Sequence, residues 1–89
     1  FLDEMLRDQT GNWRIEEVLV AKGSHLVGQT LRQADLRGHY DISVLAARDQ
    51  AGEYAYNPGA DYLIEEETAL IVLGRLDRVS ELTKIGSVR

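Results

Sequence analysis

The first strand of the chain is indicated by apolar residues that alternate with polar ones between Trp13 and Ala21. The alternation changes phase within this stretch, because Trp13 and Ile15 share one face whereas Val18 lies on the other. A β-bulge inserts one residue and exchanges the two faces. We therefore expect a bulge near Glu16.

Two further stretches are apolar on both faces and predict central strands of a sheet. They are residues 42–47 and residues 69–73. Gly74 follows the second stretch directly, and we expect it to end that strand. A strand without a polar face cannot lie against solvent, so helices are expected to cover this sheet.

A hairpin is predicted after the first of these central strands. Residues 49–52 form a polar connection that ends in glycine, and alternation resumes at residues 53–56. Tyr54 and Tyr56 should therefore face the same side. Pro58 restricts the residue before it to extended conformations, so the hairpin should end there.

A short helix is predicted between the first strand and residue 42. Thr30 and Gln33 have the spacing of a capping box, in which each side chain bonds the backbone of the other residue. Leu31 and Ala34 mark the inner side of this helix. Gly38 is expected to end it in the left-handed conformation.

The chain closes with a second helix, in which apolar residues recur every third position. Asp77 in its first turn and Lys84 in its last complement the helix dipole, and Gly86 is the expected stop. The apolar positions are Leu76, Val79, Leu82 and Ile85.

The first residues have the pattern of a short amphipathic helix and are expected to link this domain to an upstream one, with a mobile chain end as the alternative. Asp3 and Glu4 lie opposite the apolar side, and Gly11 ends the pattern. A helix this short is marginal alone, so its apolar side should dock on this domain, on a second copy or on upstream chain. The apolar side consists of Phe1, Leu2, Met5 and Leu6.

Together these elements predict an α+β domain: a small mixed β-sheet covered by helices, in the order β-α-β-β-β-α. We divide the chain into a linker helix (residues 1–12), the domain (13–86) and a tail (87–89). Its length of 89 residues allows one domain only.

Composition narrows the function mainly by exclusion. The net charge of −5 repels phosphate backbones, which disfavours general nucleic-acid binding. The absence of cysteine excludes disulfides, thiolate metal sites and cysteine nucleophiles. The longest apolar run, residues 69–73, is far too short to cross a membrane as a helix.

One segment is similar to a phosphate-binding loop. Residues 23–30 match that motif except at Gln29, where the loop requires a lysine to contact the β- and γ-phosphates. The chain is also too short for the remaining parts of a nucleotide hydrolase. A tight turn into the capped helix, permitted by Gly28, is the favoured interpretation.

Charged residues give two weaker candidate sites. Asp61 and the run Glu65, Glu66 and Glu67 could bind a hard cation, although acidic loops before buried strands are ordinarily solvated. Arg48 should emerge at the end of its strand, where its guanidinium could bind an anion. An ion pair between Arg48 and a surface carboxylate such as Asp41, Asp49 or Glu53 is the alternative.

From Trp13 to Ile85 the chain resembles the TrkA C-terminal domain, also called the C-lobe of RCK (regulator of potassium conductance) modules. It departs from the family where Glu66 and Glu67 replace the Gly-Asp that usually precedes the last strand. The matching pieces are residues 17–20, 23–31, 47–48, 57–58 with Asp61, and 70–74.

The resemblance implies a non-catalytic, homodimeric cytoplasmic domain that regulates a potassium channel or transporter. It implies an upstream dinucleotide-binding domain, a membrane pore or transporter as partner, and cyclic di-AMP or a divalent cation as regulator. The expectation of no nucleic-acid partner comes from the net charge. The ligand is expected near Arg48, Asn57 and Pro58, with Ile42 and Val44 lining the dimer face. Two alternatives remain open: an assembly module without a ligand, and the regulatory lobe of another cation or anion transporter.

Overall fold

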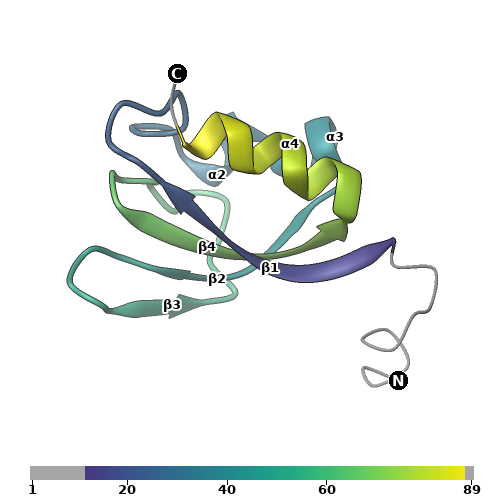
Figure 1. The fold of residues 1–89 in the computed structure, drawn as a ribbon. Helices are drawn as coiled ribbons and strands as arrows, with labels where there is room; N and C mark the ends of the chain where they lie inside the picture. The colour runs from purple at the N-terminus through teal and green to yellow at the C-terminus, as the bar shows by residue number, and fades with distance from the viewer. Residues whose placement is uncertain (1–11, 88–89) are drawn as a thin grey trace.

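Four strands form one sheet in the order β1–β4–β2–β3 (Figure 1). The computed structural model describes residues 12–87, so the expected linker helix and the last two residues of the tail lie outside the described residues. The strands are β1 (Trp13–Val20), β2 (Ser43–Arg48), β3 (Tyr54–Tyr56) and β4 (Thr68–Arg75).

All three strand pairs are antiparallel. The α+β class is confirmed, but the expectation of a mixed sheet is wrong. The reason is the position of β4, which runs between β1 and β2 and opposite in direction to both.

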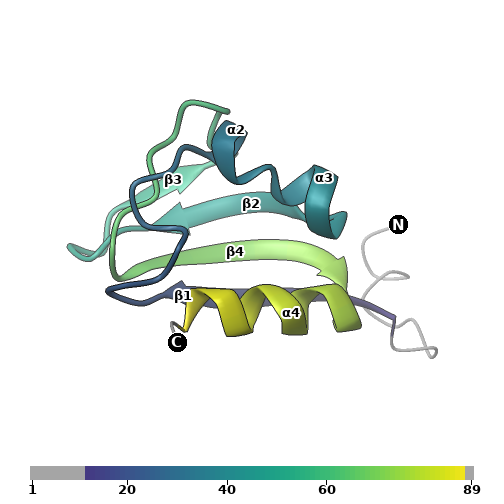
Figure 2. The ribbon, with the colours of Figure 1, turned by 90° about the horizontal axis from the view of Figure 1, so that it is seen from above.

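Within residues 12–87, three helices lie on one face of the sheet and no helix lies on its other face (Figures 1 and 2). They are α2 (Leu31–Ala34), α3 (Leu36–Tyr40) and α4 (Leu76–Gly86). Helix α4 lies over β1 and β4, whereas α2 and α3 lie toward the β2 side of the sheet (Figure 2). None of these three helices has the length and apolarity that crossing a membrane requires.

The core fills the space between the sheet and the helices. Helix α4 contributes Val79 and Leu82, which are buried as its three-residue period predicts. Strands and loops supply the other large, fully buried side chains: Val18, Val20, Ile42, Ile64, Leu70 and Val72.

Strand β1 pairs with β4 in one continuous register, so the bulge expected near Glu16 is absent. Without a bulge, the apolar residues of β1 lie on both faces of the strand. Val18 faces the core, and Trp13 remains 38% exposed on the other face. A register shift does occur in β2, between Val44 and Ala46.

The capping box is confirmed. The Thr30 hydroxyl accepts from the Gln33 N–H at 3.2 Å, and the Gln33 side-chain oxygen accepts from the Thr30 N–H at 2.9 Å. The helix ends earlier than expected, because Asp35 adopts the left-handed conformation (φ 48°) and separates α2 from α3. Asp41, also left-handed, ends α3.

The role expected for Gly38 is therefore wrong. This glycine lies within α3, where its N–H donates to Asp35 Oδ1 at 3.1 Å. A Cβ at this position would lie 2.3 Å from Asp35 Oδ2 and would displace the cap.

Gly74 also differs from expectation, because β4 continues through it to Arg75. A Cβ at Gly74 would lie 2.7 Å from Cγ1 of Ile42, so glycine permits close packing rather than ending the strand. The predicted hairpin is confirmed: β2 pairs with β3, and Tyr54 stacks on Tyr56 with ring centroids 5.6 Å apart.

Candidate functional site

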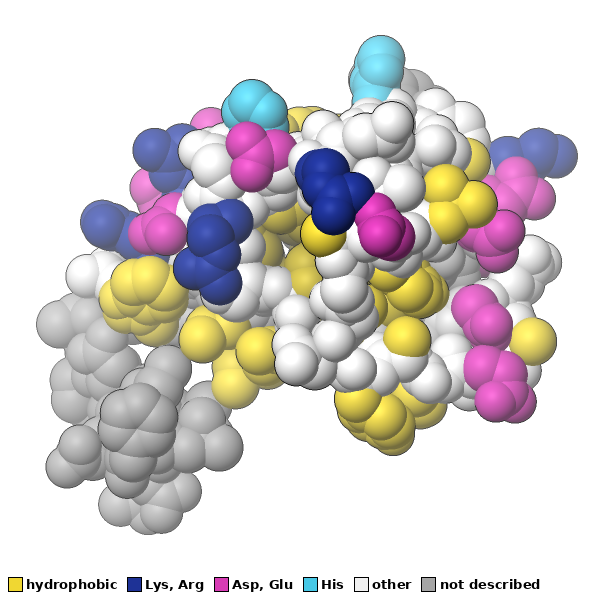
Figure 3. Space-filling model, turned by 180° about the vertical axis from the view of Figure 1, so that it is seen from behind, with side chains coloured by type: hydrophobic (Ala, Val, Ile, Leu, Met, Phe, Trp, Pro, Cys, Tyr) yellow, Lys and Arg dark blue, Asp and Glu magenta, His cyan; other side chains and the backbone are white. Residues whose placement is uncertain are grey.

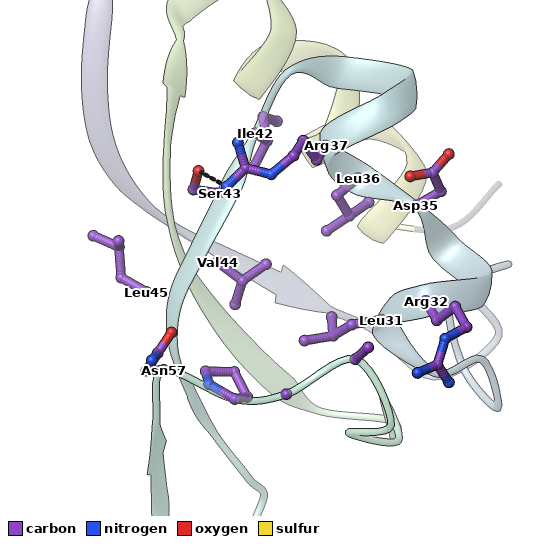
Figure 4. Close-up of a pocket in the computed structure, with 13 residues that line it drawn as sticks. Leu31, Arg32, Asp35, Leu36, Arg37, Ile42, Ser43, Val44, Leu45 and Asn57 are labelled. Carbon is purple, nitrogen blue, oxygen red and sulfur yellow. Dashed lines mark hydrogen bonds between the residues drawn. The ribbon is translucent and has the colours of Figure 1, made fainter.

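A cavity of about 480 Å³ lies between β2, the two short helices and the loop that follows β3 (Figure 4). Its volume falls within the range of small-molecule sites. The lining residues are Leu31, Arg32, Asp35, Leu36 and Arg37 from the helical segment, residues 42–45 from β2 and the residue before it, and residues 57–60 from the loop.

Four of the five residues expected to bind a ligand come together in this cavity: Ile42, Val44, Asn57 and Pro58. They lie up to sixteen positions apart in the sequence, and the return of the chain after the β2–β3 hairpin brings them into one site. The fifth, Arg48, does not line it.

The inner wall of the cavity is apolar. Leu31, Leu36 and Val44 point into the space between the helices and β2, whereas Leu45 lies on the opposite side of that strand (Figure 4). In one continuous helix, residues five positions apart would point roughly 140° away from each other. The break at Asp35 allows both leucines to face the cavity.

Two guanidinium groups lie at the rim. Arg37 Nη2 donates to the Ser43 hydroxyl at 3.0 Å (Figure 4), and Arg32 pairs with Asp61. The Arg32 and Asp61 side chains are 65% and 85% exposed, so solvent weakens this pair and an anionic ligand can compete for the arginine. Planar guanidinium groups suit phosphate or carboxylate oxygens.

Neither Arg32 nor Arg37 was expected at the site from the sequence. The available signal was their five-residue spacing within the expected helix, but an unbroken helix would have placed them on different sides. Only the break at Asp35, which the sequence pattern did not reveal, brings Arg32 and Arg37 to the same cavity.

Backbone hydrogen bonds hold the loop against both walls of the cavity. Asn57 is left-handed (φ 48°), a conformation that asparagine tolerates, so the extended conformation expected before Pro58 is wrong. The Asn57 N–H donates to the Leu45 carbonyl at 2.8 Å. On the helical side, the Arg32 N–H donates to the Ala60 carbonyl at 2.9 Å. The shape of the cavity therefore depends on main-chain contacts more than on flexible side chains.

Arg48 lies on the face of the sheet away from the helices. Its Nη2 pairs with Glu17 Oε2 at 2.9 Å, and Nη1 donates to the Tyr54 hydroxyl at 3.4 Å. The hydrogen bond with Tyr54, followed by the hydrogen bond with Glu17 and its negative charge, raises the pKa of Arg48. An ion pair was the expected alternative for this residue, but its partner is Glu17 rather than Asp41, Asp49 or Glu53.

The run of three glutamates does not form a metal centre with its neighbours. Within residues 12–87, no three His, Cys, Asp or Glu side chains lie close enough to hold an ion. Glu67 is instead a turn residue in the left-handed conformation (φ 63°), whose N–H donates to the Val20 carbonyl. Glu65 and Glu66 line a separate cavity beside Val27.

Comparison with known protein families decides the assignment. The model of the TrkA-C domain matches residues 15–85. The chain belongs to the TrkA-C domain family. The resemblance identified from the sequence is thereby confirmed, with the four-stranded sheet and its helices as the fold of this member.

Among curated proteins, the chain is similar to a K⁺/H⁺ antiporter subunit, KhtT of Bacillus subtilis (strain 168). The two are 38% identical over 68 residues, which is 76% of this chain and 41% of KhtT. The TrkA-C domain thus spans less than half the length of this relative.

Solved structures also share the fold. The RCK_C domain dimer of Streptococcus agalactiae BusR in complex with c-di-AMP has a TM-score of 0.75 at 17% identity, covering 84% of this chain and 97% of that one. The RCK C domain of the potassium transport protein KtrA, in complex with cyclic diadenosine monophosphate, has a TM-score of 0.70 at 23% identity, covering 93% and 92%.

A second BusR structure, in complex with its busAB-promotor DNA, contains the same fold over 99% of this chain and 45% of that one, at a TM-score of 0.75 and 16% identity. The TrkA-C fold therefore also occurs in a protein that binds DNA. Our expectation that this chain has no nucleic-acid partner rests on its net charge of −5 alone.

Proposed function

We propose that this chain is the ligand-sensing lobe of a potassium channel or transporter, and that two copies bind a small anionic regulator at the cavity beside β2. The observation that carries the proposal is one cavity that combines an apolar wall with the guanidinium groups of Arg32 and Arg37. KhtT, an antiporter subunit, supports a role in cation transport.

The composition of the cavity fits a nucleotide regulator, of which cyclic di-AMP is our first candidate. Guanidinium groups bind phosphate oxygens through paired hydrogen bonds, and a flat base packs on apolar side chains. In this proposal the phosphates would contact Arg32 and Arg37, and the base would pack on Val44 and Pro58, which line the same cavity. The amide of Asn57 offers a donor and an acceptor for the edge of the base.

Two copies are part of the proposal because a regulator with two equal halves matches a two-fold axis. Val44 then lies near the seam between the copies, whereas Ile42, expected beside it, is 1% exposed and packs in the core behind the seam. Binding at the seam stabilises whichever subunit arrangement fits the ligand, and the attached transporter follows that arrangement. This role requires positioning and charge, and no bond needs to be made or broken.

Two other readings are separated by the same measurements. An assembly module without a ligand would dimerise but would bind nothing in the cavity. The regulatory lobe of a different cation or anion transporter would have the same cavity. A lobe regulated by a divalent cation would bind the metal ion and not the nucleotide.

Thermal unfolding with cyclic di-AMP tests the proposal. A ligand at one hundred times its Kd adds about 2.7 kcal/mol to the free energy of unfolding, so the melting temperature should rise. The double variant Arg32→Gln with Arg37→Gln should lose this rise. The matched control, Arg48→Gln with Arg78→Gln, removes the same number of guanidinium groups outside the cavity and should keep the rise.

Sedimentation with and without the nucleotide measures the dimer directly. A dimer that forms in both conditions, together with unchanged melting across a panel of nucleotides and divalent cations, would support the assembly module instead. A stable monomer in the presence of saturating nucleotide would contradict binding between two copies.

A further inference from the structure

One large surface of the domain lies away from the cavity and has no role in the proposed function. It is the face of the sheet opposite the helices, here called the open face. It carries apolar side chains from three strands, and Tyr56, Leu19 and Tyr54 are 76%, 49% and 49% exposed. Hydrophobic side chains gather along the lower edge of the molecule, on the side away from the helices (Figure 3). The apolar residues of the open face are Trp13, Ile15, Leu19, Tyr54, Tyr56, Ile71 and Leu73.

An antiparallel sheet with one solvated face normally carries polar residues there. The open face instead has a single central ion pair, Glu17 with Arg48, surrounded by aliphatic and aromatic side chains. A contiguous apolar surface of this kind is typical of a face that another segment covers.

We propose that the N-terminal segment of the same chain, residues 1–11, docks on the open face through its apolar residues. The place where the chain joins the sheet supports this occupant. The Asn12 carbonyl accepts from the Leu76 N–H at 2.7 Å, which fixes the start of β1 beside the end of β4. Trp13, the next residue, already belongs to the open face.

The length and the apolar pattern of the segment fit this surface. Phe1, Leu2, Met5 and Leu6 lie on one side when the segment is helical. Eleven helical residues extend roughly 16 Å. The open face from Trp13 to Leu19 extends roughly 20 Å along β1, so the segment reaches across most of it.

Charge is compatible with this occupant, because Asp3 and Glu4 lie off the apolar side that docks. The segment carries three carboxylates, on Asp3, Glu4 and Asp8, against one guanidinium. At the corner where the chain enters the sheet, Arg75 faces Trp13 across the β1–β4 register. Within residues 12–87, Arg75 forms one ion pair, with Asp77 at 4.0 Å, so its charge remains available to an acidic segment.

Cross-linking tests the contact directly, because the chain contains no cysteine. The double variant Leu2→Cys with Leu19→Cys should form an intramolecular cross-link with a short bismaleimide in dilute solution, because Leu2 lies near the far end of the segment. The matched control pairs Leu2→Cys with Ser80→Cys, an exposed position on α4 at the opposite side of the sheet, and should not cross-link. Circular dichroism establishes that both variants are folded.

The single tryptophan gives a second readout without added cysteines. Replacing Met5 and Leu6 by serine should increase the quenching of Trp13 by iodide and shift its emission to the red. Replacing Asp3 and Asp8 by serine leaves the apolar side intact and should keep Trp13 more protected than the Met5 and Leu6 variant does.

The outcomes distinguish the possible occupants. A monomeric cross-link to Leu19→Cys that exceeds the Ser80→Cys control supports docking within one chain. Cross-linked dimers without a monomeric product would overturn the proposal in favour of a second copy. Equal cross-linking of both pairs, or none of either, would overturn it in favour of a segment that does not dock on the open face.

Discussion

Glu17 and Arg48 form an ion pair at 2.9 Å across the full width of β4, because β1 and β2 are the strands on either side of it. The two side chains are 51% and 35% exposed, and thirty-one positions separate them in the sequence. The pair therefore follows from the order of the strands, and its contribution to the stability of the fold is small because both side chains are exposed.

We expect Glu17→Gln and Arg48→Gln each to lower the free energy of unfolding by no more than about 1 kcal/mol, because exposed ion pairs are weak. A double-mutant cycle in urea measures the coupling between them. The exposed pair Arg78 and Glu81 on α4 provides a comparison of similar size. A coupling energy several times larger in the Glu17–Arg48 cycle would contradict this reading.

Thr68 should be a site where removing a hydroxyl stabilises the domain. Its side chain is 1% exposed, and its Oγ1 has no hydrogen-bond partner among the described residues. Thr68→Val keeps the shape and removes the unsatisfied group, so the free energy of unfolding should rise by about 1 kcal/mol.

Ser24 is the matched control for Thr68. It is 5% exposed, but its hydroxyl donates to the Ile85 carbonyl at 2.8 Å and accepts from the Leu26 N–H at 3.1 Å. Ser24→Ala should therefore lower stability. Opposite signs for the two substitutions in urea denaturation confirm the expectation, and a loss of stability in Thr68→Val would refute it.

Glu67 should tolerate glycine better than its neighbour does. Its φ of 63° is a left-handed conformation, which costs a non-glycine residue roughly 1–2 kcal/mol. Glu66 is outside that region, so Glu66→Gly only adds flexibility to the unfolded chain. We expect Glu67→Gly to be more stable than Glu66→Gly by about 1 kcal/mol. Equal melting temperatures would exclude strain at this turn.

Tyr62 should make stability depend on pH in alkaline solution. Burial, followed by the negative charges of Asp49 and Glu65, raises the pKa of Tyr62 above its ordinary value of 10.0. The unfolded chain therefore loses this proton at a lower pH than the folded chain does. The stabilisation is complete below pH 10 and is lost as the pH rises through the raised pKa.

Tyr62→Phe removes the ionisable group, so the fall in stability above pH 10 should become shallower. Tyr56→Phe, which removes a hydroxyl from a residue that is 76% exposed, is the matched control and should keep the slope of the unsubstituted protein. Urea denaturation between pH 8 and pH 11 measures all three slopes. Identical slopes for Tyr62→Phe and the unsubstituted chain would contradict the assignment.

Features that depend on neighbouring residues could be predicted from the sequence. The capping box of Thr30 and Gln33, the hairpin, and the buried side of α4 each follow from spacing within a few positions. The change of phase in β1 was also a real signal. Its interpretation as a bulge was wrong because we assumed that apolar residues must face a single core, whereas this sheet carries them on both faces.

Features that depend on distant contacts could not be predicted in the same way. The antiparallel order of the sheet and the Glu17 partner of Arg48 require knowledge of which strands are neighbours. The resemblance to the family placed Asn57 and Pro58 near a ligand, and both line the cavity. Arg32 and Arg37 were not predicted as site residues. The left-handed conformation of Asp35 interrupts the helix between them, and the spacing of apolar residues did not reveal this interruption.

Because of the register shift in β2, residues of this one strand belong to two different surfaces of the domain. Val44, before the shift, lines the cavity, while Ala46, after it, pairs with Ile71 on the opposite side of the sheet. A change in the path of this short strand alters both surfaces at once. If an occupant of one surface changes affinity at the other, the reverse effect must have the same size, so a signal could be measured from either side.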